Sequence, residues 1–289
     1  MESRSILCSA LLVGLCSALS VAPAFAAEGA DDGQSWALDR VGFAIGSYRN
    51  DLNLSAGVNG EISDTGTELD GTEIDLKRDF DFGGSHQLLF AEASWLPFER
   101  HQFSVGYHRD QRDNTRRLSR DIVFNGDTFP VDARVRAEFE YQLFDARYTY
   151  WPWLTRQDAF GLTLGVAAYR LDLKLSGEIS VGNVGSTQTK SAVFDSDVPA
   201  PLVGLDYRHA FNEDWRLFAD VSAFKASINA IDGHVASVNL GLEWYPWRHV
   251  GLALVYTGYE LRGDIERSGF EGNLKLRSSG YQLQLRLRD

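Results

Sequence analysis

Residues 131–143, VDARVRAEFEYQL, alternate strictly between two kinds of side chain. The odd-numbered positions are apolar or aromatic, and the even-numbered positions are charged or amide-bearing. Successive side chains of a β-strand point to opposite faces, so this stretch predicts a strand with one apolar and one charged face. A helix with this sequence would expose charges on every side, so we exclude a helix here.

The same alternation recurs along the chain and predicts about ten strands. A further hairpin within residues 51–85, where 67–75 also alternate, would raise the number to twelve, and eight is the lower alternative. The apolar set changes parity near Leu143 and Phe144 and again at 278–280, which predicts β-bulges at both places. The predicted strands cover residues 38–50, 86–96, 101–123, 129–150, 158–180, 190–210, 215–230, 234–245, 249–265 and 270–288.

Residues 1–26 have the features of a signal peptide. Arg4 precedes an apolar run from Ile6 to Val21, and Ala24-Phe25-Ala26 has the small-x-small form of a cleavage site. We therefore expect residues 27–36 to form a short periplasmic segment and residues 37–289 to form the folded domain. Both cysteines of the chain lie within the signal peptide, which excludes a disulfide, a thiolate metal site and cysteine catalysis in the mature protein.

After the signal peptide, no stretch of the sequence is apolar for long enough to form a transmembrane helix. An exported chain of this kind is either a soluble β-sandwich or a β-barrel in the outer membrane. The tryptophans favour the barrel because they mark every second turn, as in the aromatic girdle of a membrane barrel. The predicted girdle is Trp36, Trp95, Trp151, Trp153, Trp215, Trp244 and Trp247.

The turns between these strands fall into two alternating classes. Short connections at 97–100, 151–158, 211–214 and 245–248 are predicted to face the periplasm, together with both termini, and the glycine-containing turns between them face outward. The sequence thus predicts an all-β, closed, antiparallel up-and-down transmembrane β-barrel in the cell outer membrane.

The segment GTEIDL at Gly71–Leu76 and the turn WYPW at Trp244–Trp247 are the local features of a wider resemblance. Over most of residues 36–289 the chain resembles small outer-membrane β-barrel proteins of Gram-negative bacteria, including uncharacterised exported barrels. The resemblance implies a monomer in contact with outer-membrane lipid and lipopolysaccharide, inserted by the barrel assembly machinery. Such barrels usually end on an aromatic residue, whereas this chain ends on Leu287-Arg288-Asp289.

The inward face predicted by the alternation carries charges of both signs. Buried charges need partners, so an ion-paired network that fills the lumen is expected, and a narrow polar channel is the functional alternative. The predicted function is a passive small-solute channel or an envelope-structural protein, without catalysis. The predicted lumen residues are Glu92, His108, Asp110, Glu140, Asp145, Arg147, Arg170, Asp206, Arg208, Asp220, Glu243 and Arg286.

Particular residues of the sequence also suggest two other functions. An omptin-like protease places acidic pairs and a histidine at the outer rim, and Asp79, Asp81, Asp232 and His234 have a similar spacing. However, Asp232 and Gly233 also fit a tight type I′ hairpin turn. The third class is a surface-binding adhesin, since eight acidic residues between 61 and 81 form either a solvated loop or a surface for cations.

Composition and histidine spacing narrow the partners further. The net charge of −12 makes nucleic acid an improbable partner. The six histidines are scattered singly and do not have metal-ligand spacing, and we expect neither a metal nor a cofactor.

Overall fold

The computed structural model describes residues 35–58, 60–62, 67–69, 73–82, 86–124, 127–181, 186–228, 231–267 and 270–289. The predicted signal peptide, and all but Ser35 and Trp36 of the predicted segment 27–36, lie outside these residues. No helix in the described part of the chain is both long enough and apolar enough to cross a membrane.

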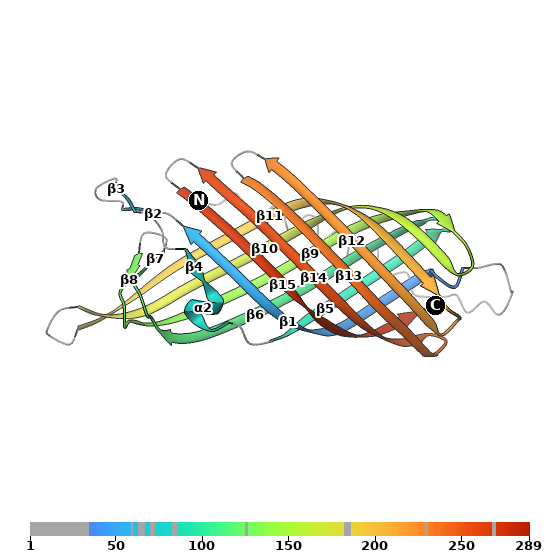
Figure 1. The fold of residues 1–289 in the computed structure, drawn as a ribbon, viewed down its shortest axis with the longest axis horizontal. Coiled ribbons are helices and arrows are strands. Elements are labelled where there is room, and N and C mark those ends of the chain that lie inside the picture. The colour runs from blue at the N-terminus through green and yellow to red at the C-terminus, as the bar shows by residue number, and fades with distance from the viewer. Residues whose placement is uncertain are drawn as a thin grey trace, which may run out of the picture. The chain divides into compact units, whose positions relative to one another are not determined.

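Ten antiparallel strands close into a ring in which each strand pairs with the next (Figure 1). The ring closes where the last strand pairs with the first, from Gly42↔Arg288 to Val58↔Gly272. The predicted ten-stranded up-and-down barrel is therefore confirmed. Its strands are β1 (Val41–Val58), β5 (His86–Phe98), β6 (His101–Arg117), β9 (Arg134–Leu154), β10 (Asp158–Val181), β11 (Ser186–Ala210), β12 (Trp215–Ile228), β13 (Ile231–Trp247), β14 (Val250–Arg267) and β15 (Phe270–Arg288).

The connection between β1 and β5 adds no strand to the ring, so the twelve-strand alternative is wrong. It contains a short hairpin of β2 (Gly60–Ile62) and β3 (Thr67–Leu69), then β4 (Ile74–Asp75) and α2 (Leu76–Phe80). A second small hairpin, β7 (Ile122–Phe124) with β8 (Asp127–Phe129), connects β6 to β9. Figure 1 shows these elements at the same end of the barrel, opposite the end that holds the C-terminus.

Strand β10 shows how the barrel wall is built at the end with the short turns. Leu162, Leu164 and Val166 point outward and are 45–60% exposed, while Thr163 between them points inward and is buried. The outward apolar run of β10 extends from Phe160 to Ala168, which matches the length that a membrane strand requires. This half of the barrel therefore has the apolar outer face and polar interior of a membrane barrel.

In the other half of the barrel the two faces exchange character. On the same strand, Tyr169, Leu171 and Leu173 point inward and are almost fully buried, while Arg170 and Lys174 point outward. The inward side chains form an apolar core like that of a soluble protein, and the outward ones lie where water surrounds the strands. The buried members of this outer core are Leu52, Leu54, Ile74, Leu76, Phe80, Phe82, Leu118, Ile122, Phe129, Ala133, Val135, Ala137, Phe139, Ala167, Tyr169, Leu171, Leu173, Leu175, Ala200, Val235, Leu261 and Leu276.

This exchange accounts for the parity changes in the sequence, and the bulges predicted from them are wrong. The pairing of β9 with β6 runs without a shift from Tyr150 to Arg134, and that of β15 with β14 runs without a shift from Leu287 to Phe270. The side chains keep their alternation while the medium outside the wall changes from lipid to water, so the apolar residues move to the other face.

A bulge does occur lower on β9, beside the turn to β10. The register shifts between Phe160 and Leu162, so that Trp151 and Pro152 both lie opposite Gly161. Because of this extra residue, Trp151 points inward and Trp153 points outward although both have odd numbers. A Cβ at Gly161 would lie 2.9 Å from the Trp151 ring, so glycine is needed at this close approach.

Above the short strand β5, helix α2 completes the wall between β1 and β6. Strand β4 pairs with β1 through Ser55↔Asp75, and Phe80 accepts a hydrogen bond at its carbonyl oxygen from Asn114 of β6 (2.7 Å). Arg112 of β6, also buried, donates to the carbonyl oxygen of Phe82 (3.0 Å). Residues 73–82 are therefore folded into the barrel wall.

The first and last strands of the barrel, β1 and β15, are also joined by side-chain contacts. The side-chain carboxylate of Asp289 accepts hydrogen bonds from the backbone N–H groups of Arg40 (3.0 Å) and Val41 (3.1 Å). The guanidinium of Arg288 lies 3.7 Å from the centre of the Tyr245 ring. Arg288 and Asp289 thus have a structural role at the join between β15 and β1.

Candidate functional site

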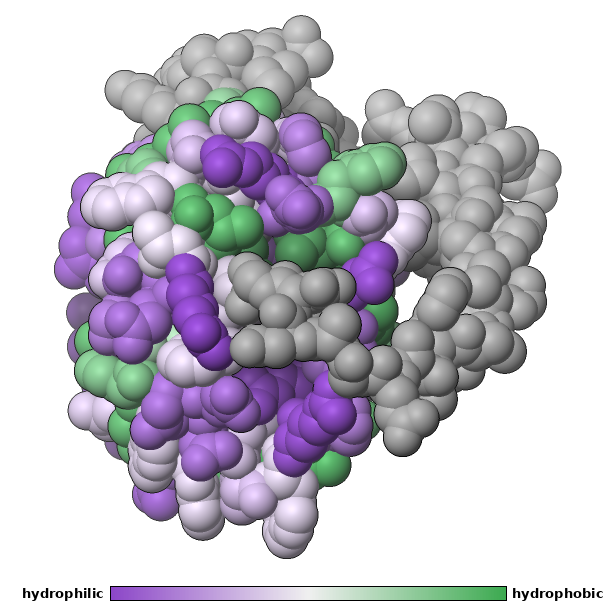
Figure 2. Space-filling model, turned by 90° about the vertical axis from the view of Figure 1, so that its right-hand side faces the viewer, coloured by the Kyte–Doolittle hydropathy of each residue, from purple (hydrophilic) through white to green (hydrophobic). Residues whose placement is uncertain are grey.

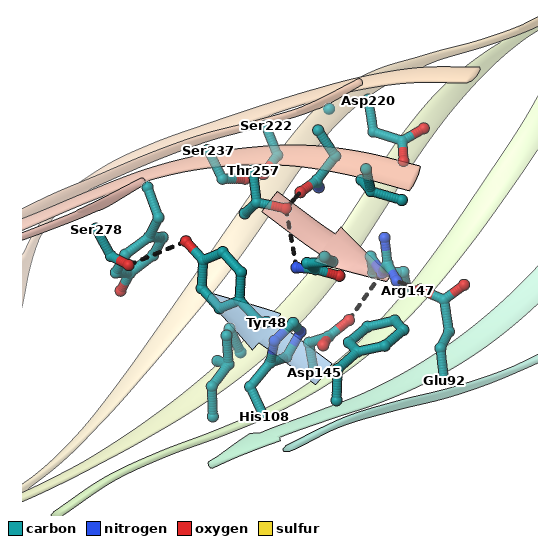
Figure 3. A pocket seen from close by; sticks show the side chains of 18 of the residues that line it. Tyr48, Glu92, His108, Asp145, Arg147, Asp220, Ser222, Ser237, Thr257 and Ser278 are labelled. Carbon is teal, nitrogen blue, oxygen red and sulfur yellow. Dashed lines mark hydrogen bonds and ion pairs between the residues drawn. The ribbon is translucent and has the colours of Figure 1, made fainter. Parts of the chain in front are cut away.

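A cavity of about 150 Å³ lies inside the barrel below the outer core, and Figure 3 shows side chains projecting into it from strands on all sides. Its walls include His108 and most of the charged residues predicted for the lumen. These predicted residues are Glu92, Asp110, Asp145, Arg147, Asp206, Arg208, Asp220 and Arg286.

The charges that line the cavity are paired with one another. Arg147 forms an ion pair with Glu92 and another with Asp145, whose oxygen lies 2.7 Å from Nε. Arg208 lies 3.2 Å from Asp220, and its guanidinium stacks on the ring of Phe218 (4.7 Å). Each of these arginines is shared by two carboxylates, and five carboxylates and three arginines line the cavity in all, so its wall disfavours an anion.

The opposite side of the cavity is lined by tyrosines. The rings of Tyr141, Tyr169 and Tyr259 lie with their centres 5.9–6.5 Å apart, and Tyr48 shares a hydrogen bond with Ser278 (3.1 Å). Neutral polar side chains complete the wall, such as the Ser222–Ser237 hydrogen-bonded pair (2.7 Å). The cavity is therefore amphipathic, with aromatic surface near the outer core and polar groups on the other side.

Below the cavity, a second cluster of charges closes the barrel toward the short turns. Glu243 lies 2.8 Å from Arg216 and forms a further ion pair with Arg286. Arg216 also pairs with Asp39 (2.7 Å) and donates to the Tyr245 hydroxyl (3.0 Å). The space left between these groups is only about 50 Å³.

The residues just before β1 cross this end of the barrel. Arg216 donates to the carbonyl oxygen of Ala37 (3.0 Å), and Ala37 and Leu38 are buried against Trp151. Arg156 stacks on the ring of Trp36 (4.0 Å). Figure 2 views this end, where strongly hydrophilic residues are interspersed with apolar ones. Residues 35–39 thus form an inner plug, which the sequence did not predict.

The prediction that Glu140 and Arg170 line the lumen is wrong, because both side chains point outward. Glu140 pairs with Arg109 of the neighbouring strand (2.9 Å), and Arg170 is exposed. Both lie beyond the level at which the outer face becomes polar. Sequence reasoning also missed Arg112 and Arg216, which are inward and buried; their even numbers match the inward sets of β6 and β12, so alternation alone contains the signal.

The tryptophans mostly lie on the outer surface. Trp95, Trp153, Trp215, Trp244 and Trp247 are exposed. Trp215 and Trp244 stack with ring centres 5.8 Å apart. Trp36 and Trp151 are the exceptions: Trp36 is half-buried in the inner plug, and Trp151 is 0% exposed and donates from Nε1 to Gln102 (3.2 Å) inside the barrel.

The acidic residues predicted for the outer rim have local structural roles. Asp79 of α2 pairs with Arg78 (3.0 Å) and Arg120 (2.7 Å), and Asp81 ends α2 in the left-handed conformation. Asp232 lies within β13 opposite Ser227 and does not form the hairpin turn, so the type I′ turn predicted there is wrong. Within the described residues, no group of three or more histidine or acidic side chains has the arrangement of a metal site.

We expect Asp79 to hold α2 in place in a pH-dependent way. Burial raises the pKa of Asp79, but hydrogen bonds from Arg78 and Arg120 outweigh it and leave the pKa below its usual value. A lowered pKa stabilises the fold above the unfolded value of about 3.9, and this stabilisation is lost as pH falls through the folded value. The rate at which pepsin cuts residues 73–82 of the folded barrel, divided by its rate on the unfolded chain at the same pH, should therefore rise as pH falls below about 4.

A substitution should reproduce this opening at neutral pH. In Asp79→Asn, trypsin is expected to cleave after Lys77 and Arg78 while the barrel remains folded. Asp113→Asn is the matched control, since Asp113 is an exposed carboxylate paired with Arg136 (3.0 Å). Equal resistance of Asp79→Asn and the wild type would contradict a role for Asp79 in holding the helix.

Comparison with known proteins supports the architecture. No family model and no curated protein sequence matches the chain. Among solved structures, the outer membrane protease OmpT from Escherichia coli has a TM-score of 0.53 and 10% identity, with 86% of this chain and 97% of that one covered. The toluene transporter TodX of Pseudomonas putida (0.32; 10%; 87% and 90%) and the Ail protein of Yersinia pestis (0.26; 8%; 84% and 97%) are more distant.

The chain is an outer-membrane β-barrel of the Gram-negative type. Three features define this class: the closed ring of ten strands, the apolar outer band and the shared fold with OmpT. The location in the cell outer membrane follows from them.

Proposed function

We propose that this protein is a monomeric, non-enzymatic barrel of the cell envelope whose lumen is closed to flow along its axis. Of the two functions that the sequence left open, the geometry favours the structural one over the passive channel. The observation that carries the proposal is that the cavity lies between two filled regions, the outer core on one side and the inner plug on the other.

Both filled regions are tightly packed in the described part of the chain. In the outer core, Val135, Ala137 and Leu175 have no exposed surface although they point toward the barrel axis. At the other end, Ala37 and Trp151 are equally buried. A conducting pore needs a continuous water path, and a ten-stranded barrel has little interior beyond what its own side chains fill.

The arrangement of the rim residues supports a non-catalytic role. A general base needs a free lone pair directed at substrate, whereas the carboxylate of Asp79 already accepts from Arg78, Arg120 and the backbone N–H of Asp75. His234 lies in the β13 ladder opposite Lys225 and Arg262.

A surface-binding role is the second candidate, and the part of the barrel above the apolar band favours it. There the outward face is covered by ion pairs such as Arg109–Glu140 and Arg277–Glu260 (3.0 Å), and the core behind them keeps the strands rigid. A protein that only spans the bilayer does not need this extension. Contact with lipopolysaccharide at the apolar band and insertion by the barrel assembly machinery complete the proposal.

We expect the purified, refolded barrel to be silent in a planar lipid bilayer. Opening the lumen would require both unpacking the outer core and breaking the Arg216 ion pairs, so stepwise conductance should be absent at moderate voltage. Folding is checked by the different migration of heated and unheated samples on a gel. Reproducible steps that change in size in Glu92→Gln would overturn the closed-lumen proposal in favour of a pore.

A further inference from the structure

The barrel wall separates between β11 and β12. These strands pair only from Ala210↔Arg216 to Val203↔Ala223, although β12 continues to Ile228 and β11 continues back to Ser186. Continuing the same register would bring five more residues of β12 opposite 202–198. The two strands are therefore unpaired over a length of about 17 Å, at about 3.4 Å per residue.

Two prolines explain why the ladder stops. In the continued register, Lys225 would face Pro201 and Ser227 would face Pro199. Proline has no N–H to donate, so two successive hydrogen bonds from β11 to β12 are missing. The pairing of β11 with β10 nevertheless runs through both prolines, to Ala168↔Pro199 and beyond. The prolines therefore leave the pairing of β11 with β10 intact and stop its pairing with β12.

The separation begins at the outer margin of the apolar band. Two outward residues just below it, Val203 in the last pair with Ala223 and Val221 two residues earlier on β12, are 53% and 52% exposed. Beyond them the sequence of β12 changes to Lys225 and that of β11 to Asp197. The opening in the wall therefore faces the boundary between the outer lipid leaflet and water.

The cavity reaches the wall at this place. It is lined by Gly204 and Ser222 of the upper paired rungs and by Leu202, the first residue of β11 without a partner on β12. Gly204 keeps this corner open, since a Cβ there would lie 2.9 Å from the carbonyl oxygen of Val221. Figure 3 shows Ser222 beside Ser237 at the margin of the cavity.

The ring has a second incomplete pairing, between β1 and β5, and there other elements cover the unpaired edge. Strand β1 loses β5 above Asn50↔His86, but there β4 pairs with β1 and α2 packs beside it. On β11, no described residue takes the place of β12 beside Pro199 and Pro201 in the sheet. Since the outer core and the inner plug fill the barrel along its axis, the side of the barrel is the shortest way out of the cavity.

We propose that the separation of β11 and β12 is a lateral portal through which a small uncharged amphiphile passes between the outer leaflet and the cavity. The volume of about 150 Å³ suits a molecule with one aromatic ring. The rings of Tyr141, Tyr169 and Tyr259 offer stacking surface, and Ser222, Asn239 and Thr257 offer hydrogen bonds to a hydroxyl or carbonyl group. The excess of carboxylates over arginines disfavours an anionic ligand, and entry from the lipid favours an uncharged one.

Cysteine labelling in lipid vesicles tests this proposal, because the predicted mature chain has no cysteine. In Ser222→Cys, N-phenylmaleimide is small, uncharged and aromatic and should label the folded barrel readily. With each rate divided by the reagent's own rate toward a free thiol, a permanently charged methanethiosulfonate should label it at least about tenfold more slowly, since it does not enter through lipid. Saturating p-cresol should slow the labelling by N-phenylmaleimide.

A second variant tests the route. Adding Pro199→Val and Pro201→Val restores both N–H groups, and we expect the extended ladder to slow N-phenylmaleimide by about tenfold. Pro130→Val, in the connection from β8 to β9, is the matched control and should leave the rate unchanged. Faster labelling by the charged reagent, or no labelling of the folded barrel, would overturn the portal. Neither result depends on conductance, so the closed-lumen proposal and the portal fail separately.

Discussion

Replacing Glu243 with alanine is expected to destabilise the folded barrel by about 3–5 kcal/mol, the largest effect that we predict for a single side chain. Glu243 is 2% exposed and forms ion pairs with two arginines, Arg216 and Arg286. Its carboxylate also accepts a hydrogen bond from the Tyr245 hydroxyl (3.2 Å). The alanine variant would remove the buried carboxylate that both arginines share.

The midpoint of urea unfolding measures this effect, followed by the gel position of unheated samples. The matched control is Glu138→Ala, which also removes a glutamate between two cations, Arg136 (3.1 Å) and Lys174 (3.5 Å). The Glu138 side chain is 40% exposed on the outer face, so its loss should cost about 1 kcal/mol or less. Equal losses in the two variants would mean that the Glu243 cluster is hydrated and not buried.

Introducing arginine at Leu164 is the second substitution with a large expected effect. Leu164 is 60% exposed, and on a soluble protein an arginine at such a position would be nearly neutral. It lies in the middle of the outward apolar run of β10, where an arginine at the bilayer midplane costs about 2–4 kcal/mol. The experiment therefore asks which medium surrounds this side chain.

Ser176→Arg on the same strand and face is the control, because it lies beyond the level at which the outer surface becomes polar. Its expected change is within about 0.5 kcal/mol. Both variants are compared in lipid vesicles, since detergent adapts more easily to a charge. If Leu164→Arg unfolds at the same urea concentration as the wild type, the apolar band does not lie in the hydrocarbon.

Alternation in the sequence was sufficient to predict the ring and most strand positions, because each strand must keep one face toward a defined medium. Thus β10 and β15 were predicted to within one residue of their observed bounds. The same rule failed beyond the membrane. Glu140 and Arg170 were placed in the lumen because a single medium was assumed outside the whole strand.

The features of the site that sequence analysis missed arise from contacts distant in the chain. The Trp151 side chain points inward because it packs against Gly161 and Ala37. Alternation within one strand does not reveal contacts between residues so far apart in the chain. The point at which the β11–β12 ladder ends depends on the register of the two strands, which would place Pro201 opposite Lys225. That register follows from the folded hairpin and not from the sequence of either strand alone. The prolines were visible in the sequence, but their position on one edge of a wall strand was not.

The join at Asp289 has a consequence for how the molecule is made. Its carboxylate accepts from the N–H groups of Arg40 and Val41 across 249 and 248 residues of chain, so this join can form only after Asp289 has been synthesised and exported. Until then β1 and β15 each keep an unpaired edge, which is a template for aggregation. Closure of the ring therefore depends on contacts of the highest sequence separation in the barrel, a class of contact that forms slowly during folding.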